Sequence, residues 1–152
     1  KVVKPQNIDR YRSLFSVIFS DFHLFDRLYG VDLTDEQKLY DLLEDMKLDE
    51  KVHYRNNRFS TTNLSTGQRK RLAMVVALLE DRDVYLFDEW AADQDPEYRR
   101  WFYTDFLMKL KKEGRTVIAI THDDRYFDVA DKIVWMEEGR ISKVSSPADA
   151  TV

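Results

Sequence analysis

The sequence predicts an α/β fold with a parallel sheet, and three observations support this class. Short apolar runs at residues 14–19, 84–87 and 116–121 have the continuous hydrophobicity of strands that are buried on both faces. Segments with helical spacing of apolar residues separate these runs. Polar or ionisable side chains follow each run, and the carboxyl ends of parallel strands meet at one edge of a sheet. Those side chains are Ser20 and Asp21, Asp88 and Glu89, and His122.

Composition limits the class of protein further. The 152 residues are 43% hydrophobic and 34% charged, which suits one globular domain with its own core. The net charge of −4 gives no electrostatic reason to expect nucleic acid as a partner. Cysteine is absent, which excludes disulfides and thiol chemistry. The longest strongly apolar run, 72–79, is far shorter than the roughly 20 residues of a membrane span. We therefore expect a soluble globular piece.

The first half of the chain is expected to place two helices after the first strand. Residues 1–12 read as the end of a hairpin strand followed by a short helical turn. Thr34 and Gln37 have the spacing of a capping box, in front of a helix with one apolar face. Residues 56–63 are polar and predict a loop, and a second amphipathic helix follows it.

The second half predicts a crossover and a final hairpin. Asp95 and Pro96 are suited to cap and begin a helix that extends to Lys112. A strand, this helix and the next strand then form a right-handed parallel crossover. Residues 132–136 and 140–144 alternate around a Glu-Gly turn and predict a hairpin, after which we expect a loose tail.

Four short motifs follow one another in a fixed order. Residues 64–68 read Leu-Ser-Thr-Gly-Gln, residues 86–89 Leu-Phe-Asp-Glu, residues 93–96 Asp-Gln-Asp-Pro and residues 121–123 Thr-His-Asp. In this order they resemble the signature motif, the Walker B motif, the D-loop and the switch histidine of the nucleotide-binding domain of ABC transporters. Order and spacing match from about residue 10 to 142. The residues around the first strand, together with Asp-Glu-Trp at 88–90, resemble the sequences of the cyclic-peptide and siderophore exporter subfamily.

The resemblance implies a P-loop NTPase-like parallel sheet core with an inserted α-helical signature subdomain. It assigns residues 1–25 and 81–145 to the core, residues 26–80 to the subdomain and residues 146–152 to a tail. A P-loop requires the pattern GxxxxGK[ST], and none of the four glycines precedes a lysine. We therefore expect the Walker A strand to be missing from this chain. By this interpretation the chain is the C-terminal part of an ATPase domain and is inactive alone.

The resemblance also implies a site for ATP and Mg²⁺ at the strand ends. Asp88 is expected to hold Mg²⁺ through water, Glu89 to polarise the attacking water, and His122 to contact the γ-phosphate. Ser20 stands where the family has the glutamine of the Q-loop. A serine can reach the metal through water, and Asp21 can take the metal-binding role in its place.

The start of the second helix is expected to meet the ATP of a dimer partner, because backbone N–H groups there favour a phosphate. The nucleotide-binding residues expected on this basis are Ser65, Thr66, Gly67, Gln68 and Asp95. Three cations occupy the same first turn, where they oppose the helix dipole unless a polyanion arrives. A solvated basic face is the other interpretation of these three residues, Arg69, Lys70 and Arg71.

The function implied is that of an ABC exporter, which couples ATP hydrolysis to export of a peptide or siderophore-like compound. Its partners would be a second nucleotide-binding domain in a homodimer and a transmembrane domain fused upstream, at the cytoplasmic face of the membrane. Two other readings stay open. One is a soluble ABC-type ATPase of DNA repair or translation, against which the exporter-like residues 21–26 argue. The other is a non-catalytic interaction module without a P-loop.

Overall fold

A parallel three-stranded sheet lies at the centre of the computed structural model, which describes residues 3–31 and 33–149. Its strand order is β1-β4-β5, and both pairings are parallel. In register, Val84 of the middle strand lies opposite Phe15 on one side and Thr116 on the other, so the carboxyl ends are level. The predicted α/β class with a parallel sheet is confirmed. The strands are β1 (Phe15–Ile18), β4 (Val84–Asp88) and β5 (Thr116–Ile120).

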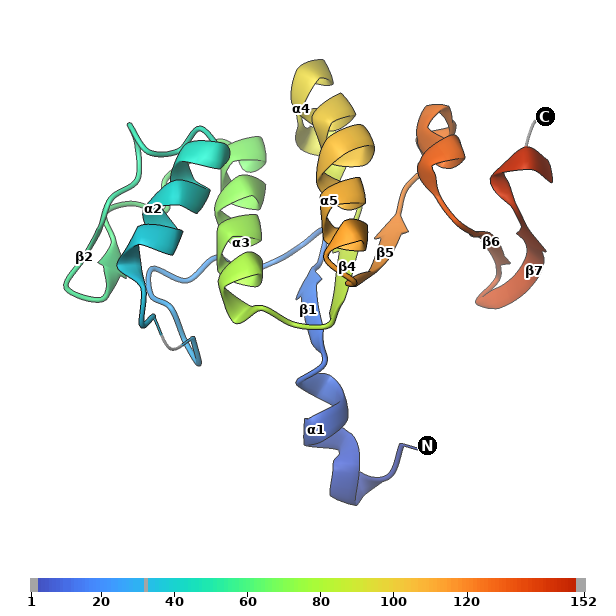
Figure 1. Cartoon of the computed structure of the whole chain (residues 1–152), viewed down its shortest axis with the longest axis horizontal. Helices are drawn as coiled ribbons and strands as arrows, with labels where there is room; N and C mark the ends of the chain where they lie inside the picture. Colours follow the sequence, from blue (N-terminus) through green and yellow to red (C-terminus); the bar gives the residue numbers. More distant parts are fainter. Residues whose placement is uncertain (1–2, 32, 150–152) are drawn as a thin grey trace.

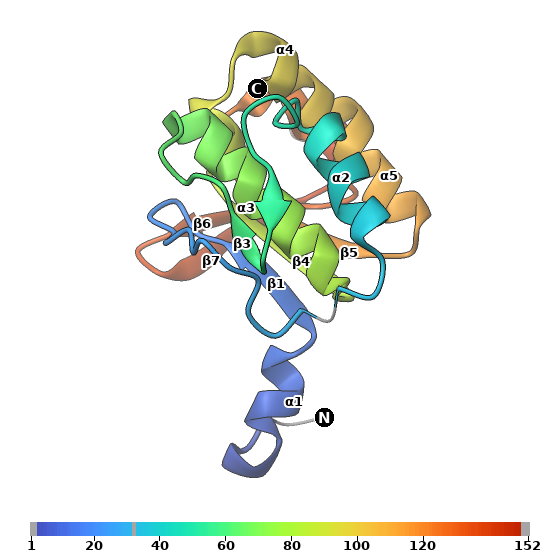
Figure 2. The same ribbon diagram turned by 90° about the vertical axis from the view of Figure 1, so that its left-hand side faces the viewer.

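Helices α2, α3 and α5 lie side by side on the same side of the sheet, whereas α1 extends away from the rest of the chain (Figures 1 and 2). No helix among the described residues combines the length and the apolar character that crossing a bilayer demands. A short 3₁₀ turn, Pro5–Asn7, precedes α1. The helices are α1 (Ile8–Arg12), α2 (Glu36–Asp45), α3 (Thr66–Glu80), α4 (Pro96–Trp101) and α5 (Leu107–Lys112).

Helix α3 joins the helical region to the sheet. Ser65 caps it, and apolar residues at helical spacing, including Leu72 and Val75, are fully buried. The helix packs against α2 on one side and β1 on the other. One continuous core therefore extends across the predicted boundaries of the signature subdomain, and the division at residues 26 and 80 stays a prediction.

The helix that follows the central strand begins as predicted and is irregular in its middle. Asp95 accepts a hydrogen bond from the N–H of Tyr98 at 3.0 Å, and Pro96 is the first helical residue. A π-helical segment, Phe102–Phe106, separates α4 from α5. The wider turn holds aromatic side chains against the sheet, because Phe102 and Phe106 both contact Phe87 edge-on. The sequence prediction of one regular helix was wrong at this segment.

Two further predictions differ from the structure. Asp35, rather than Thr34, caps α2, because its carboxylate accepts the N–H of Gln37 at 2.9 Å. The polar loop predicted at 56–63 contains part of a two-stranded hairpin. Asn56 and Asn57 form its turn with φ of 50° and 63°, the left-handed backbone that asparagine tolerates. The hairpin strands are β2 (Tyr54–Arg55) and β3 (Arg58–Phe59).

The final hairpin is present as predicted and forms a sheet of its own. Its strands are β6 (Ile133–Glu137) and β7 (Arg140–Ser145), with Glu138 and Gly139 in the turn. A short 3₁₀ turn, Pro147–Asp149, follows it, so only the end of the predicted tail, residues 150–152, lies outside the described chain. The start of the predicted N-terminal hairpin strand, residues 1 and 2, lies outside it as well.

Candidate functional site

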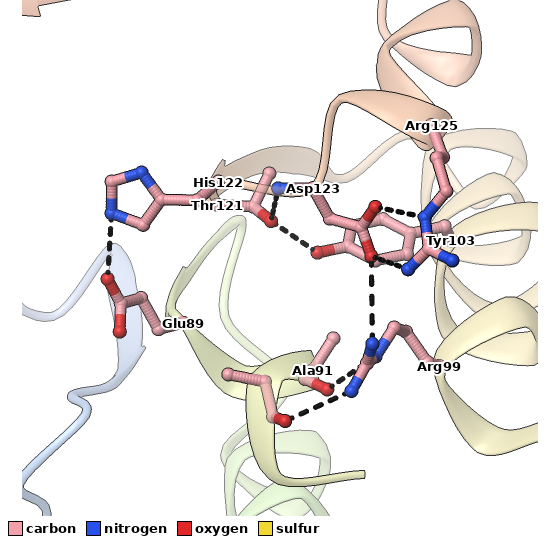
Figure 3. A pocket seen from close by; sticks show the side chains of 9 residues that line it. Glu89, Ala91, Arg99, Tyr103, Thr121, His122, Asp123 and Arg125 are labelled. Carbon is pink, nitrogen blue, oxygen red and sulfur yellow. Dashed lines mark hydrogen bonds and ion pairs between the residues drawn. The ribbon is translucent and has the colours of Figure 1, made fainter. Parts of the chain in front are cut away.

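The ends of β4 and β5 bring a carboxylate and an imidazole together. Glu89 follows β4, and its backbone N–H donates to the carbonyl of Ile120 at 3.0 Å, which continues the strand pairing by one residue. Glu89 then turns the chain with φ of 49°, a left-handed conformation that is uncommon for a residue other than glycine. Its Oε1 lies 3.2 Å from Nε2 of His122. The two residues predicted as catalytic are therefore neighbours (Figure 3).

The end of β1 contributes a second contact. Oδ2 of Asp88 accepts hydrogen bonds from the Ser20 backbone N–H at 3.3 Å and from its hydroxyl at 3.2 Å. A carboxylate beside a hydroxyl offers the oxygen ligands that Mg²⁺ prefers, with water completing its shell. These residues fit the predicted metal. Ser20 and Asp21 are both exposed, and Ser20 is the one for which the structure gives a hydrogen bond to Asp88. No group of three or more acidic, histidine or cysteine side chains gathers for a metal among the described residues.

A cavity of about 380 Å³ opens beside Glu89 and His122. Segments that are distant in sequence line it, because the chain passes the carboxyl edge of the sheet after β4, along α4 and again after β5 (Figure 3). The lining residues are Glu89, Ala91, Ala92, Arg99, Tyr103, Thr121, His122, Asp123 and Arg125.

Arg99 fixes the backbone of one wall of this cavity. Its guanidinium donates to the carbonyls of Ala91 at 3.2 Å, Ala92 at 3.1 Å and Gln94 at 3.2 Å. It also lies 4.0 Å from the carboxylate of Asp123, next to the predicted switch histidine. Arg99 thus connects the segment after β4 to the segment after β5.

Asp123 and Tyr103 complete the opposite wall. The Arg125 guanidinium donates to both oxygens of Asp123, at 2.7 and 2.8 Å, and these hydrogen bonds lower the pKa of Asp123 below its ordinary value. The Tyr103 hydroxyl donates to the Thr121 hydroxyl at 2.8 Å, and burial raises the pKa of Tyr103. Thr121 also accepts the backbone N–H of Asp123 at 3.0 Å, so the loop that presents His122 is held from both sides.

The signature-like segment lies at the start of α3, outside the cavity lining. Ser65 and Gln68 form a reciprocal capping box, with the Gln68 N–H donating to the Ser65 hydroxyl at 3.3 Å. Gly67 is a close-approach position, because a Cβ there would lie 2.7 Å from the carbonyl oxygen of Asp93. Ser65 and Thr66 remain exposed. Their predicted contact with a partner's nucleotide, like that of Asp95, which caps α4, stays a prediction.

The three cations after the signature point into the protein. Lys70 is buried, and its ammonium pairs with Asp93 and with a backbone carbonyl. Arg71 donates to the carbonyl of Met46 at 3.1 Å, and Arg69 lies over the ring of Phe22. Lys70 is therefore neither part of a solvated basic face nor available to bind a phosphate, and both interpretations from the sequence are wrong for this residue.

Sequence reasoning missed Arg99 and Tyr103, which line the cavity, and it did not anticipate that Lys70 is buried. Arg99 and Tyr103 project from the α4 and π-helical region, where their spacing matches ordinary helical residues. The sequence Asp123-Asp124-Arg125 could have indicated the Asp123–Arg125 pair, because a carboxylate and a guanidinium two residues apart can pair at a strand end.

Comparisons with known proteins agree with this geometry. The family model described as "ABC transporter" matches residues 1–92. The ATP-binding protein SyrD of Pseudomonas syringae pv. syringae is 52% identical over 137 residues, which cover 86% of this chain and 24% of SyrD. The macrolide export ATP-binding/permease protein MacB of Bartonella henselae is 29% identical, over 86% of this chain and 21% of MacB. The chain thus spans about a quarter of the length of SyrD.

Solved structures share the fold. A bacterial Atm1-family ABC exporter with ATP bound superposes with a TM-score of 0.75 at 20% identity, over 91% of this chain and 26% of that one. A dimeric ATP-binding cassette in a post-hydrolysis state, bound to ADP and Pi, superposes with a TM-score of 0.74 at 19% identity, over 95% of this chain and 68% of that one. The arrangement of strands and helices around the site is therefore that of these cassettes.

Proposed function

The chain belongs to the ABC transporter family, and on that premise we propose that it forms part of an ATP-hydrolysing domain that drives export across a membrane. The observation that carries the proposal is the pairing of Glu89 with His122 at 3.2 Å, at the level ends of parallel strands and beside Asp88. Open α/β sheets bind ligands at this edge.

The residues divide the work of hydrolysis. Glu89 accepts a proton from the water that attacks the γ-phosphorus, while the bond to the β–γ bridging oxygen breaks and ADP leaves. His122 holds Glu89 and the phosphate in line. Asp88 and Ser20, which contact each other, would provide oxygen ligands for Mg²⁺ and its waters. Mg²⁺ bound there would offset the negative charge of the phosphate oxygens. Asp21 stays a second candidate for the metal.

The phosphate-binding loop is supplied by residues outside this chain. No glycine in the 152 residues precedes a lysine, and the backbone cradle of a P-loop needs both. The isolated chain is therefore inactive, and activity belongs to the full-length protein that contains it. In that protein a transmembrane domain is fused upstream, and the ATPase domain lies at the cytoplasmic face of the membrane.

Two copies complete each other's sites in a homodimer. The exposed start of α3, with Ser65 and Thr66, is free of the cavity that Glu89 lines, so it can serve a nucleotide held by the other copy. Gly67, Gln68 and Asp95 belong to the same nucleotide contact. The dimeric cassette bound to ADP and Pi supports this arrangement by analogy of fold.

Export, rather than import, is the proposed direction, and the compound is peptide- or siderophore-like. The exporter-like segment after β1 supports this direction, as does the similarity to the macrolide export protein MacB.

The test is steady-state ATP hydrolysis by the purified full-length protein, with Glu89→Gln and a matched control. Glu97→Gln is the control, because Glu97 carries an exposed carboxylate, 85% accessible, on α4. We expect Glu89→Gln to lower turnover by about 10²–10⁴-fold, the usual effect of losing a general base, and Glu97→Gln to leave it unchanged. Normal turnover by Glu89→Gln would show that Glu89 is an ordinary strand-end carboxylate.

A further inference from the structure

Lys70 is a buried cation inside the helix that the signature begins. Its side chain is 2% exposed, and Nζ lies 2.7 Å from Oδ2 of Asp93. The same Nζ donates to the backbone carbonyl of Glu89 at 2.7 Å. A buried charge persists only where hydrogen bonds and a counter-charge replace water, and Lys70 has both. The hydrogen bond to the backbone of Glu89 links Lys70 to the residue that is proposed to activate water.

The backbone of Lys70 is tied to the same segment. The indole N–H of Trp90 donates to the carbonyl of Lys70 at 2.9 Å. Trp90 is 1% exposed and stacks on Phe102 with ring centroids 4.5 Å apart, so it cannot follow a small shift of α3 without disturbing the core. Both ends of the lysine are therefore bound to the turn that follows β4.

The turn at Glu89 needs this support. Glu89 has a φ of 49°, and a residue other than glycine keeps this left-handed backbone conformation only when its surroundings impose it. In this conformation the carbonyl of Glu89 points to Lys70 and accepts from the N–H of Ala92 at 3.2 Å as well, while the side chain reaches His122. The ammonium therefore fixes the peptide whose orientation decides where the Glu89 carboxylate lies.

We propose that Lys70 is a positioning residue for hydrolysis, which acts by holding Glu89 in the left-handed turn that aims its carboxylate at the reacting water. The inference rests on the proposed ATPase function. It assigns to the lysine a role inside its own chain, because burial removes the ammonium from any nucleotide. Lys70 touches neither substrate nor metal, and its effect passes through Glu89.

The test uses the full-length protein with Lys70→Met and, as the control, Lys111→Met. Lys111 pairs with Asp131 at the surface, so the control removes a lysine–aspartate pair of the same chemistry away from the site. We expect Lys70→Met to lower kcat by about 10²-fold, the effect of misplacing a catalytic group by about 1 Å, with the KM for ATP unchanged. Lys111→Met should keep both constants.

A second measurement separates positioning from general stability. In the Glu89→Gln background, Lys70→Met should lower the residual hydrolysis rate no further, since the group that Lys70 positions is already gone. A purely structural lysine would lower it by the same factor in both backgrounds. Should Lys70→Met fail to fold, Lys70→Gln keeps a polar end at the buried position, and the same loss of kcat is expected.

The outcomes also distinguish this inference from the proposed function. If the wild-type protein hydrolyses ATP and neither Lys70 variant changes kcat, the inference is overturned while the function stands. The same holds if the losses multiply in the double variant. If the wild-type protein does not hydrolyse ATP, the proposed function fails and the inference falls with it.

Discussion

Strand β5 presents an open sheet edge, from which we predict that the purified 152-residue chain self-associates. Among the described residues β5 pairs with β4 alone, and Ile118 and Ile120 are 43% and 47% exposed. The separate β6–β7 hairpin exposes more apolar surface, with Met136 64% and Ile141 63% accessible. Soluble proteins avoid such edges, because unpaired N–H and C=O groups accept a strand from another molecule.

The exposed fractions give the magnitude. Fully burying one aliphatic side chain contributes roughly 1.5–3 kcal/mol, so each half-exposed residue contributes about 1 kcal/mol on association. Six exposed apolar residues on β5 and the hairpin together supply on the order of 6 kcal/mol, and hydrogen bonds along the edge add about 1 kcal/mol each. The six are Ile118, Ile120, Val134, Met136, Ile141 and Val144. Association costs at least about 4 kcal/mol. With about two to six such hydrogen bonds, the balance is about 4–8 kcal/mol in favour of association, which corresponds to a dissociation constant between about 1 mM and 1 μM.

Light scattering across a concentration series that spans this range measures the association. Ile118→Lys and Ile120→Lys place charges on the edge and should shift the chain towards monomer. Tyr29→Lys is the control, since Tyr29 is 61% exposed and lies outside the sheet. A well-folded monomer at every concentration would refute the reasoning, and so would association that survives both lysine substitutions.

Three further predictions concern the site. Trp90→Ala should lower the free energy of unfolding by about 3–5 kcal/mol, the usual loss for a buried aromatic, and a loss below about 1 kcal/mol in a denaturant titration would contradict its anchoring role. Because Arg125 lowers the pKa of Asp123, their pairing stabilises the fold above the unfolded-state pKa of about 4 and is lost as pH falls through the lower folded-state pKa. Asp123→Asn should therefore flatten the acid side of the stability–pH profile, and an unchanged slope would exclude the pairing. Ser20→Ala should raise the Mg²⁺ concentration needed for hydrolysis in the full-length protein more than Asp21→Asn does, because the Ser20 hydroxyl contacts the strand-end carboxylate, and the reverse order would assign the metal to Asp21.

The strands and helix ends could be predicted because their signals are local. The run 84–87 is apolar throughout, which only a strand covered on both faces requires. Asp95 and Pro96 carry a cap and a helix start in adjacent residues. The convergence of Glu89 and His122 then followed from the parallel order of strands, since their ends must meet.

Tertiary contacts decided the features that could not be predicted. Lys70 stands between two arginines, and nothing in that run indicates that the middle cation is buried and the carbonyl of Glu89 its partner. The π-helical segment lies where Phe102 and Phe106 pack on Phe87, a contact between separate parts of the chain that the local sequence does not reveal. Asp35 and Thr34 are both good caps, and the choice between them depends on how the chain enters α2.

The central claim is that Glu89 activates water and does not bind ATP. The most direct test is to identify the nucleotide that the Glu89→Gln variant retains. The full-length variant would be incubated with α-labelled ATP and Mg²⁺ and separated from free nucleotide, and its bound nucleotide would then be identified as ATP or ADP. We predict that it is recovered as intact ATP in a dimer, because binding survives while proton transfer from water is lost. Recovery of ADP at the wild-type rate would contradict the account.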